Sequence, residues 1–104
     1  MRPDAILVEA HLAVLRDLAR RLDDTGHRSA GDVNKGSLPY ARWFVDHALE
    51  LGPLLPLDKL ARWVGFVQGV MAAHGVLDVD VERDRTRALF HQAYGALGVG
   101  REAV

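Results

Sequence analysis

The sequence contains no cysteine and few aromatic residues. Without cysteine there can be no disulfide framework, no thiolate nucleophile and no thiolate metal site. No run of about 18 uncharged apolar residues occurs, so we expect no membrane-spanning helix. Asp4 and Glu9 interrupt the N-terminal apolar stretch, which argues against an export signal. These absences lead us to expect a cytoplasmic protein.

Neither sign of charge dominates the chain. There are 13 lysines and arginines against 14 acidic residues, a formal net charge of -1. Because proteins that bind nucleic acids in general carry a basic excess, we do not expect this class. The length of 104 residues and the 49% hydrophobic content are typical of one globular domain with one core.

Hydrophobic periodicity predicts four helices. They are expected at about residues 4–25, 38–51, 56–74 and 79–97, with a loop at 27–36 and a tail at 98–104. Ser37 and Asp78 are the expected N-caps of the second and fourth helices, and Gly75 is the expected C-cap of the third. Short links between the last three helices favour antiparallel neighbours. The predicted fold is a single all-α domain over 1–104, a four-helix antiparallel bundle-like arrangement.

The third predicted helix has an unusual composition, ARWVGFVQGVMAAHG at 61–75. The helical period places an apolar set on one face: Leu60, Trp63, Val64, Val67, Val70, Met71 and His74. The opposite face carries almost no side chains, and we call Ala61, Gly65, Gly69 and Ala72 on it the small-residue stripe. Each glycine in a helix interior costs roughly 0.5–1 kcal/mol relative to alanine, so close approach of another body is the simplest compensation.

Three bodies could lie against the small-residue stripe. The first is another helix of the same chain, packed backbone to backbone. The second is the same helix of a partner subunit, since symmetric dimers are the commonest oligomers. The third is a small ligand in contact with Arg62 and Gln68, which flank the stripe.

The fourth predicted helix begins DVDVERDRTRALF. Its expected core face consists of Val79, Phe90, Ala93, Tyr94 and Leu97. Arg83 and Thr86 point close to this face, with Glu82 and Arg87 at its edges. An arginine near a core either forms an internal ion pair or lines a pocket for an anion, because its planar guanidinium can hold phosphate or carboxylate at two points. Candidate partners for Arg83 are Asp46, Asp58 and Glu82.

The loop GDVNKGS at 31–37 leads into a predicted helix N-terminus. Free backbone N–H groups at such a position can bind phosphate. The loop is not a P-loop, because Lys35 precedes the second glycine instead of following it. Two interpretations stay open: an ordinary interhelical loop, or a lid that places Asn34 and Lys35 over a ligand.

No catalytic, cofactor or metal motif stands out. The five histidines show no spacing typical of metal ligands. An enzyme would have to use Glu82, Asp84 or His91, and the last two lie on the outer side of the fourth helix. We therefore expect binding more than catalysis, with no cofactor and no metal.

The string RWVGFVQGVMAAHGVLDVDVERDRTR at 62–87 resembles small proteins of tailed bacteriophages and prophages that share an R-W-x-G-F-x-Q-G helix. The matching residues are Arg62, Trp63, Gly65, Phe66, Gln68, Gly69, Gly75, Glu82, Arg83 and Arg87. The resemblance implies a phage or prophage origin and a helical fold. It supplies no activity.

These patterns lead to one main hypothesis and one alternative. The main hypothesis is a phage or prophage accessory protein, acting against host defence, that binds an anionic small ligand such as a nucleotide signal. Its expected ligand-binding residues are Arg62, Gln68, Arg83, Thr86 and Arg87, with Asn34 and Lys35 as the lid. The alternative is an inhibitor or adaptor that binds a host immune complex. In both cases we expect a homo-oligomer in the host bacterial cytoplasm.

Overall fold

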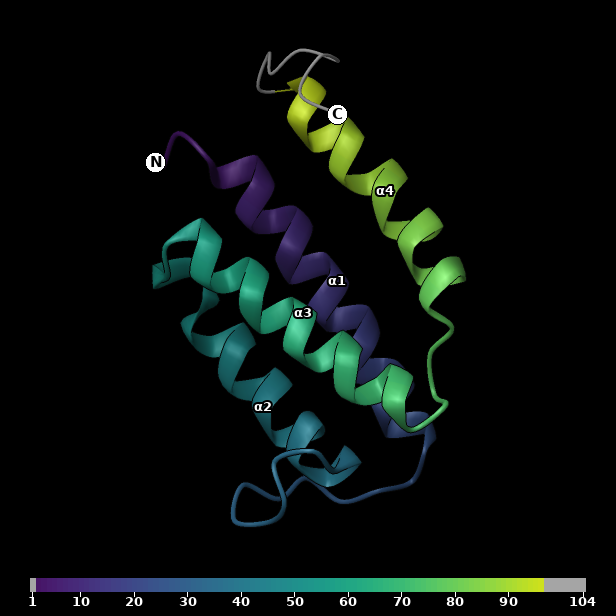
Figure 1. Ribbon diagram of the computed structural model, residues 1–104. Coiled ribbons are helices and arrows are strands. Elements are labelled where there is room, and N and C mark those ends of the chain that lie inside the picture. Colours follow the sequence, from purple (N-terminus) through teal and green to yellow (C-terminus); the bar gives the residue numbers. More distant parts are fainter. Residues whose placement is uncertain (1, 97–104) are drawn as a thin grey trace.

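Four α-helices alternate in direction along the chain (Figure 1). The structure, a computed structural model, describes residues 2–96. The helices are α1 (Ala5–Asp24), α2 (Leu38–Leu51), α3 (Leu57–Ala73) and α4 (Val79–Ala96), and a short 3₁₀ helix, η1 (Gly52–Leu54), follows α2. No strand occurs within 2–96, so the all-α four-helix prediction is confirmed. The helix ends agree with the predicted ones to within about two residues, while residue 97 and the tail at 98–104 lie outside the described residues.

The predicted capping residues explain where the helices begin and end. The Ser37 hydroxyl accepts a hydrogen bond from a backbone N–H in the first turn of α2 at 3.3 Å. Asp78 Oδ1 does the same for α4 at 3.0 Å. Gly75 ends α3 with φ +72°, a left-handed conformation that favours glycine. Side chains outside the helices therefore satisfy N–H groups that have no partner within them.

Helix α1 occupies the centre of the molecule and packs against each of the other three helices. For this reason it is buried over a broad part of its surface, while Glu9, Arg16 and Arg20 remain exposed. The buried residues are Leu7, Val8, Ala10, His11, Leu12, Val14, Leu15, Leu18, Ala19 and Leu22. Because α1 contacts three helices, its buried side chains form the centre of the hydrophobic core.

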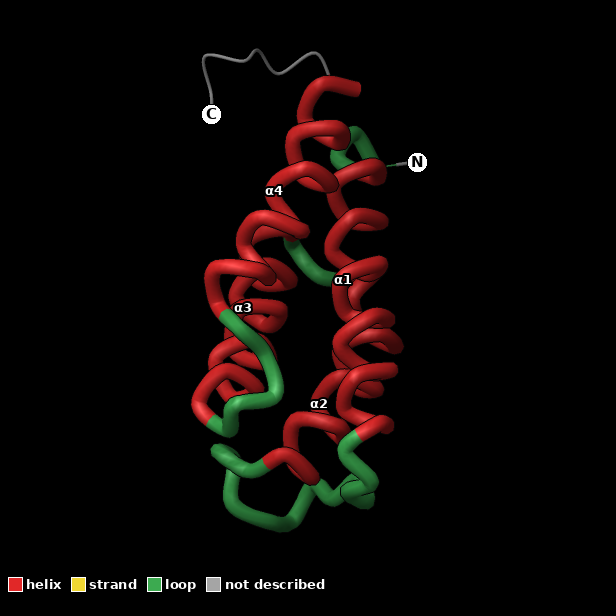
Figure 2. Tube along the Cα trace, turned by 90° about the vertical axis from the view of Figure 1, so that its right-hand side faces the viewer, coloured by secondary structure: helices red, strands yellow, loops and turns green. Residues whose placement is uncertain are grey.

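Helix α3 lies beside α1 and α2 and buries one face against them. Five of its seven predicted core residues are buried: Leu60, Val64, Val67, Val70 and Met71. His74 was predicted on this face but is exposed, and its Nε2 lies 2.6 Å from the carbonyl oxygen of Gly36. This contact joins the end of α3 to the loop before α2, and Figure 2 shows both connections at the same end of the molecule.

An aromatic stack closes the outer side of the α2–α3 pair. The Trp43 and His47 rings lie 5.3 Å apart with an interplanar angle of 12°. The His47 and Trp63 rings follow at 5.9 Å and 17°. Gly31 packs so closely on Trp43 that a Cβ at Gly31 would come within 2.7 Å of the indole. The loop, α2 and α3 are thus held together by stacked rings.

Helix α4 packs chiefly against α1 and diverges from α3 as it leaves the turn at 74–78 (Figure 1). Its apolar contact is small: Ala93 is buried against Leu7 and Ala10, with Leu89 and Phe90 packed around them. The predicted core face of this helix is wrong at two positions, since Val79 is 59% and Tyr94 36% exposed. Leu97, the last residue of that predicted face, lies outside the described residues.

Candidate functional site

A cavity of about 300 Å³ lies where α3 and α4 diverge. Its lining residues are Gln68, Gly69 and Ala72 from α3, Leu77 from the turn, and Val79, Glu82, Arg83 and Thr86 from α4. Gly69 and Ala72 have little or no side chain, so they leave the space open. This volume is at the lower end of the range typical of small-molecule pockets. We call it the α3/α4 pocket.

Three of the predicted ligand-binding residues meet in this pocket: Gln68, Arg83 and Thr86. The other arginines of the predicted set do not line it. Arg62 is exposed on α3 and its Nη1 lies 3.4 Å from Asp58 Oδ2, and Arg87 is exposed on α4. The helical period placed Gln68 and Thr86 correctly but did not show how α3 and α4 are placed relative to each other.

The predicted lid residues also lie outside the lining of the pocket. Both Asn34 and Lys35 are exposed in the loop between α1 and α2. Asn34 Oδ1 accepts a hydrogen bond from the backbone N–H of Gly36 at 2.7 Å. Together with the contact between His74 and Gly36, this bond fixes the loop against the end of α3, so in the observed arrangement the loop does not cover the pocket.

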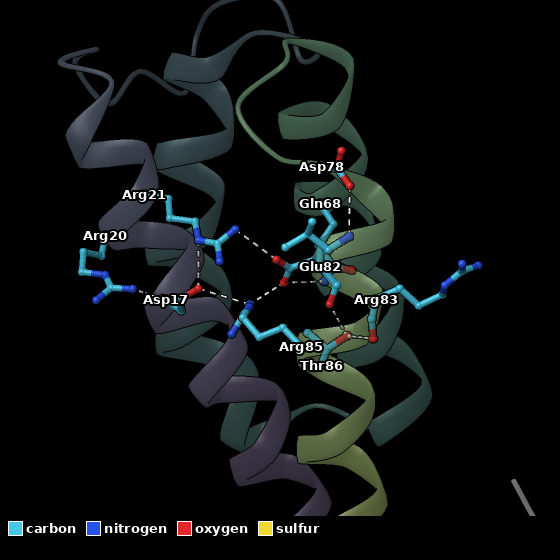
Figure 3. A network of polar contacts seen from close by, with 10 residues as sticks. Asp17, Arg20, Arg21, Gln68, Asp78, Glu82, Arg83, Arg85 and Thr86 are labelled. Atoms are coloured by element: carbon cyan, nitrogen blue, oxygen red, sulfur yellow. Dashed lines mark hydrogen bonds and ion pairs between the residues drawn. The ribbon is translucent and has the colours of Figure 1, made fainter.

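Glu82 forms part of the pocket wall and is 4% exposed (Figure 3). Its Oε2 accepts a hydrogen bond from Arg21 Nη1 of α1 at 3.1 Å. Its Oε1 is approached by Arg85 Nη2 and, at 3.4 Å, by Gln68 Nε2. A buried carboxylate needs such partners, because burying an unpaired charge is strongly unfavourable.

A second carboxylate completes this network. Asp17 Oδ2 lies 3.1 Å from Arg21 Nε and 3.1 Å from Arg85 Nη2, at angles unsuitable for hydrogen bonds. These contacts are therefore mainly Coulombic. Asp17 Oδ1 also accepts a hydrogen bond from the exposed Arg20 (Figure 3). Among the four groups that join α1 to α4, the two carboxylates and two guanidinium groups alternate, and their formal charges cancel. We call Asp17, Arg21, Glu82 and Arg85 the α1–α4 ion-pair network.

Arg83 does not have the position that its sequence predicted. Its side chain is 63% exposed, and its Nη2 lies 3.2 Å from Asp80 Oδ1 on the same helix, not from Asp46, Asp58 or Glu82. In Figure 3 it points away from the ion-pair network, which contains Arg85 in its place. The reason is the rotation of α4, which turns Glu82, Thr86 and Ala93 inward and leaves Arg83 at the pocket rim.

Thr86 is buried, as its position near the core face predicted. Its hydroxyl donates a hydrogen bond to the backbone carbonyl of Glu82 at 2.9 Å, within the same helix. The hydroxyl hydrogen is thus engaged, and the oxygen can only accept a hydrogen bond from a ligand. Gln68 has one amide N–H directed at Glu82 and is half-buried at the pocket wall.

The two glycines of the small-residue stripe have open space beside them. A Cβ added at Gly65 or Gly69 would meet no atom within 4 Å beyond its own helix in the described part of the molecule. Close packing against another helix of the same chain is therefore the wrong explanation for these glycines. Ala61 is exposed and Ala72 half-buried, and Gly69 and Ala72 line the pocket. A ligand and a second subunit remain as explanations.

The sequence did not predict that Glu82 and Arg85 form an ion pair inside the fold. Glu82 and Arg85 are three residues apart, and Asp17 and Arg21 are four apart, spacings that usually mark solvated pairs on a helix surface. The sequence offered one signal for this contact. Two such pairs occur, one on the first helix and one on the fourth, and both helices carry few other charges on their inner faces. Their contact across α1 and α4 required the tertiary structure.

Other types of site have less support. Within residues 2–96, no group of three or more His, Asp or Glu side chains is placed to bind a metal ion. None of the helices in the same range has the length and hydrophobicity to cross a membrane. Among the residues considered for catalysis, Asp84 and His91 are exposed and lie outside the pocket lining.

No family model, curated protein or solved structure matches this chain.

Proposed function

We propose that this chain is a phage or prophage accessory protein that acts by stoichiometric binding of a small anionic ligand in the α3/α4 pocket. The observation that supports the proposal is the meeting of Gln68, Arg83 and Thr86 around one cavity. The phage origin rests on the resemblance of residues 62–87. Sequestration of a host signal, for which a nucleotide is one chemical candidate, is the action against host defence that such binding would provide.

The electrostatics of the pocket favour an anion at Arg83. The partner of Arg83, Asp80, is 82% exposed, and exposed ion pairs of this kind contribute little free energy, roughly 0–1 kcal/mol. Exchange of Asp80 for a ligand anion is therefore inexpensive. The adjacent ion-pair network has no net formal charge, so it neither attracts nor repels strongly as a unit. A guanidinium group can then hold a phosphate or carboxylate at two points.

The contacts of the Glu82 carboxylate favour binding over catalysis. Both of its carboxylate oxygens are engaged, by Arg21 on one side and by Arg85 and Gln68 on the other. A general acid or base must reach the proton that it transfers. Glu82 would have to leave these partners before it could act on a substrate, so it serves the pocket as a structural group.

Native mass spectrometry of the protein purified gently from cells tests the proposal. We expect the wild type to retain extra mass corresponding to one small molecule per subunit. Arg83→Gln should lose this mass, whereas Arg16→Gln should keep it, because Arg16 pairs with Glu9 on α1 and lies outside the pocket lining. Ligand retained equally by all three proteins, or a wild type that binds no small anion, would reject the proposal.

A second candidate function is association through the outer face of α3. The observation that favours it is the open space at Gly65 and Gly69 of the small-residue stripe within the described chain, beside Phe66, which is 38% exposed. We propose a second copy as the occupant, since a self-complementary face suits a symmetric dimer. A host immune complex is the other possible partner.

Light scattering coupled to size-exclusion chromatography tests this association. Gly65 is exposed and lies outside the pocket lining, so Gly65→Glu should introduce a charged side chain into the contact without altering the pocket. We expect the wild type to have the mass of a dimer and the variant that of a monomer. A wild type that is monomeric at high concentration would exclude the homodimer and leave a foreign partner to be sought.

A further inference from the structure

The walls of the α3/α4 pocket are mainly apolar. Leu77 is 6% exposed at its end near the turn, and Val79 and Ala72 add aliphatic groups on either side. Gly69 has no side chain at all, so a flat group can lie directly on the backbone of α3. A surface of this kind binds a compact apolar body by removing it from water.

The pocket has a single cationic side chain in its lining, that of Arg83. Arg21 and Arg85 lie behind Glu82 and are already shared between Glu82 and Asp17. The remaining arginines expected from the sequence, Arg62 and Arg87, lie outside the lining. One ligand charge can therefore be neutralised at the rim, and a second would find no further cation among the described residues that line the pocket.

The acidic neighbour of Arg83 acts against additional negative charge. Asp80 lies two residues before Glu82 on the same helix and is 82% exposed at the rim, whereas the charge of Glu82 is already balanced by Arg21 and Arg85. A ligand with several phosphates would bring its further charges towards the Asp80 carboxylate. Repulsion between like charges is stronger near a protein surface than in bulk water, because the effective dielectric constant is lower.

We infer that the ligand is a small monoanion with a compact apolar body, such as an arylalkyl carboxylic acid, and not a polyphosphate. This inference rests on the proposed function and narrows it. The carboxylate binds the Arg83 guanidinium at the rim, and the ring lies over Gly69 and Ala72 with its edge against Leu77. The Thr86 oxygen, whose hydrogen is engaged within the helix, accepts a hydrogen bond from a ligand that carries a donor on the ring.

Two-dimensional ¹⁵N–¹H NMR and calorimetry with four probes test the inference. The probes are 3-phenylpropionate, its uncharged amide 3-phenylpropionamide, AMP and ADP. We expect 3-phenylpropionate to shift the backbone amide signals of Gly69 and Thr86 saturably. The uncharged amide should bind about 10-fold more weakly or worse, since it lacks a charge-assisted bond to Arg83. ADP should bind more weakly than the carboxylic acid.

Matched variants separate the role of Arg83 from general charge effects. Arg83→Gln should reduce the affinity for 3-phenylpropionate to that for its amide, with the amide unaffected. Arg16→Gln, which makes the same change in net charge outside the pocket, should behave as the wild type. A two-dimensional spectrum of each variant with the dispersion of the wild type shows that the fold is retained.

Three outcomes would overturn the inference. Tighter binding of ADP than of 3-phenylpropionate, lost in Arg83→Gln, would reject the monoanion but uphold an anion site at Arg83. Equal binding of 3-phenylpropionate and its amide would show that the charge is not recognised. No shift at Gly69 or Thr86 with any probe would mean that the pocket does not take this class of ligand, while the mass spectrometry described above decides separately whether it holds another anion.

Discussion

Arg21 Nη1 on α1 lies 3.1 Å from Glu82 Oε2 on α4, although 61 residues separate the two in the sequence. The side chain of Glu82 is 5% exposed, so this is a nearly buried carboxylate that depends on a distant cation. The pair joins the second half of α1 to the first turns of α4. It also fixes one wall of the α3/α4 pocket, because Glu82 belongs to both.

Removal of the Glu82 charge should therefore destabilise the fold. Glu82→Gln keeps the shape of the side chain but leaves Arg21 and Arg85 with one carboxylate between them. Breaking a buried ion pair costs about 3–5 kcal/mol, and we expect the low end, about 3 kcal/mol, because both arginines are partly exposed to water. Urea unfolding monitored by circular dichroism measures the change.

The control for Glu82 is Asp80→Asn on the same helix. This residue pairs with Arg83 at 3.2 Å but is 82% exposed, so its loss should change the free energy of unfolding by less than about 0.5 kcal/mol. Equal destabilisation by the two substitutions would mean that the network contributes no more than an ordinary surface pair.

Replacement of glycine by alanine should have opposite effects on stability at Gly65 and at Gly75. At Gly65 an added Cβ meets nothing within 4 Å, so Gly65→Ala should stabilise the chain by about 0.5–1 kcal/mol through helix propensity. At Gly75 there is also open space, but φ is +72°, so Gly75→Ala should destabilise it by about 1–2 kcal/mol. Thermal unfolding of both variants at dilute protein concentration provides the comparison, and a destabilised Gly65→Ala would indicate a close contact on that face, such as the second copy proposed above.

Gly31 is the position where a methyl group should disturb packing. Its Cβ would come within 2.7 Å of the Trp43 ring, so Gly31→Ala must displace either the loop or the indole. Because Trp43 is 37% exposed and can shift outward, we expect a loss near 1 kcal/mol, the low end for overpacking. Tryptophan fluorescence should change as well, and an unaltered emission spectrum together with unaltered stability would contradict the stacked arrangement.

Asp4 should make stability depend on acidity. Arg2 binds its carboxylate through Nε at 2.8 Å and Nη2 at 2.9 Å, and donates to the Leu55 carbonyl at 2.6 Å. The hydrogen bond from Arg2 lowers the pKa of Asp4 below its ordinary value of 3.8. A lowered pKa stabilises the fold fully above the ordinary value, and this contribution disappears as the pH falls through the folded-state pKa.

We therefore expect the stability difference between wild type and Asp4→Asn to be constant near neutral pH and to shrink below pH 3.8. Unfolding curves at several pH values measure it. Glu9→Gln serves as the control, because it removes an exposed acid from the same helix region, one that pairs with Arg16 and not with Arg2. A difference that grows on acidification would reverse the assigned sign of the pKa shift.

The sequence predicted α3 well and α4 poorly, for one physical reason. The partners of α3 both lie on one side, so its apolar face and its buried face coincide at Leu60, Val64 and Val67. Helix α4 has one main partner, and that partner covers Glu82, which the hydrophobic pattern placed only at the edge of the core face, while Val79 and Tyr94 of the predicted core face stay exposed. Burial of a charge depends on cations from a distant part of the chain, and local periodicity contains no information about them.

The residues of the candidate site were also predicted only in part. Gln68, Arg83 and Thr86 could be grouped from the sequence because a short turn brings the end of α3 and the start of α4 together. Arg62 and Arg87 were grouped with them but do not line the pocket: Arg62 lies farther from the turn, and Arg87 directly follows Thr86 but is exposed on another face of α4. Spacing along a helix gives the face of each residue, whereas the angle between two helices comes only from their packing.

The attachment of α4 mainly through α1 has a consequence for how the molecule opens. If α4 separates as a unit, α1, α2 and α3 keep their mutual contacts, while the pocket loses one wall and no longer exists. Ligand binding and the docking of α4 are then linked equilibria, and any molecule that occupies the pocket must slow the hydrogen–deuterium exchange of α4 amides. Amides of α2, which opens by a different route, would keep their rates, so exchange measured helix by helix reports occupancy without knowledge of the ligand.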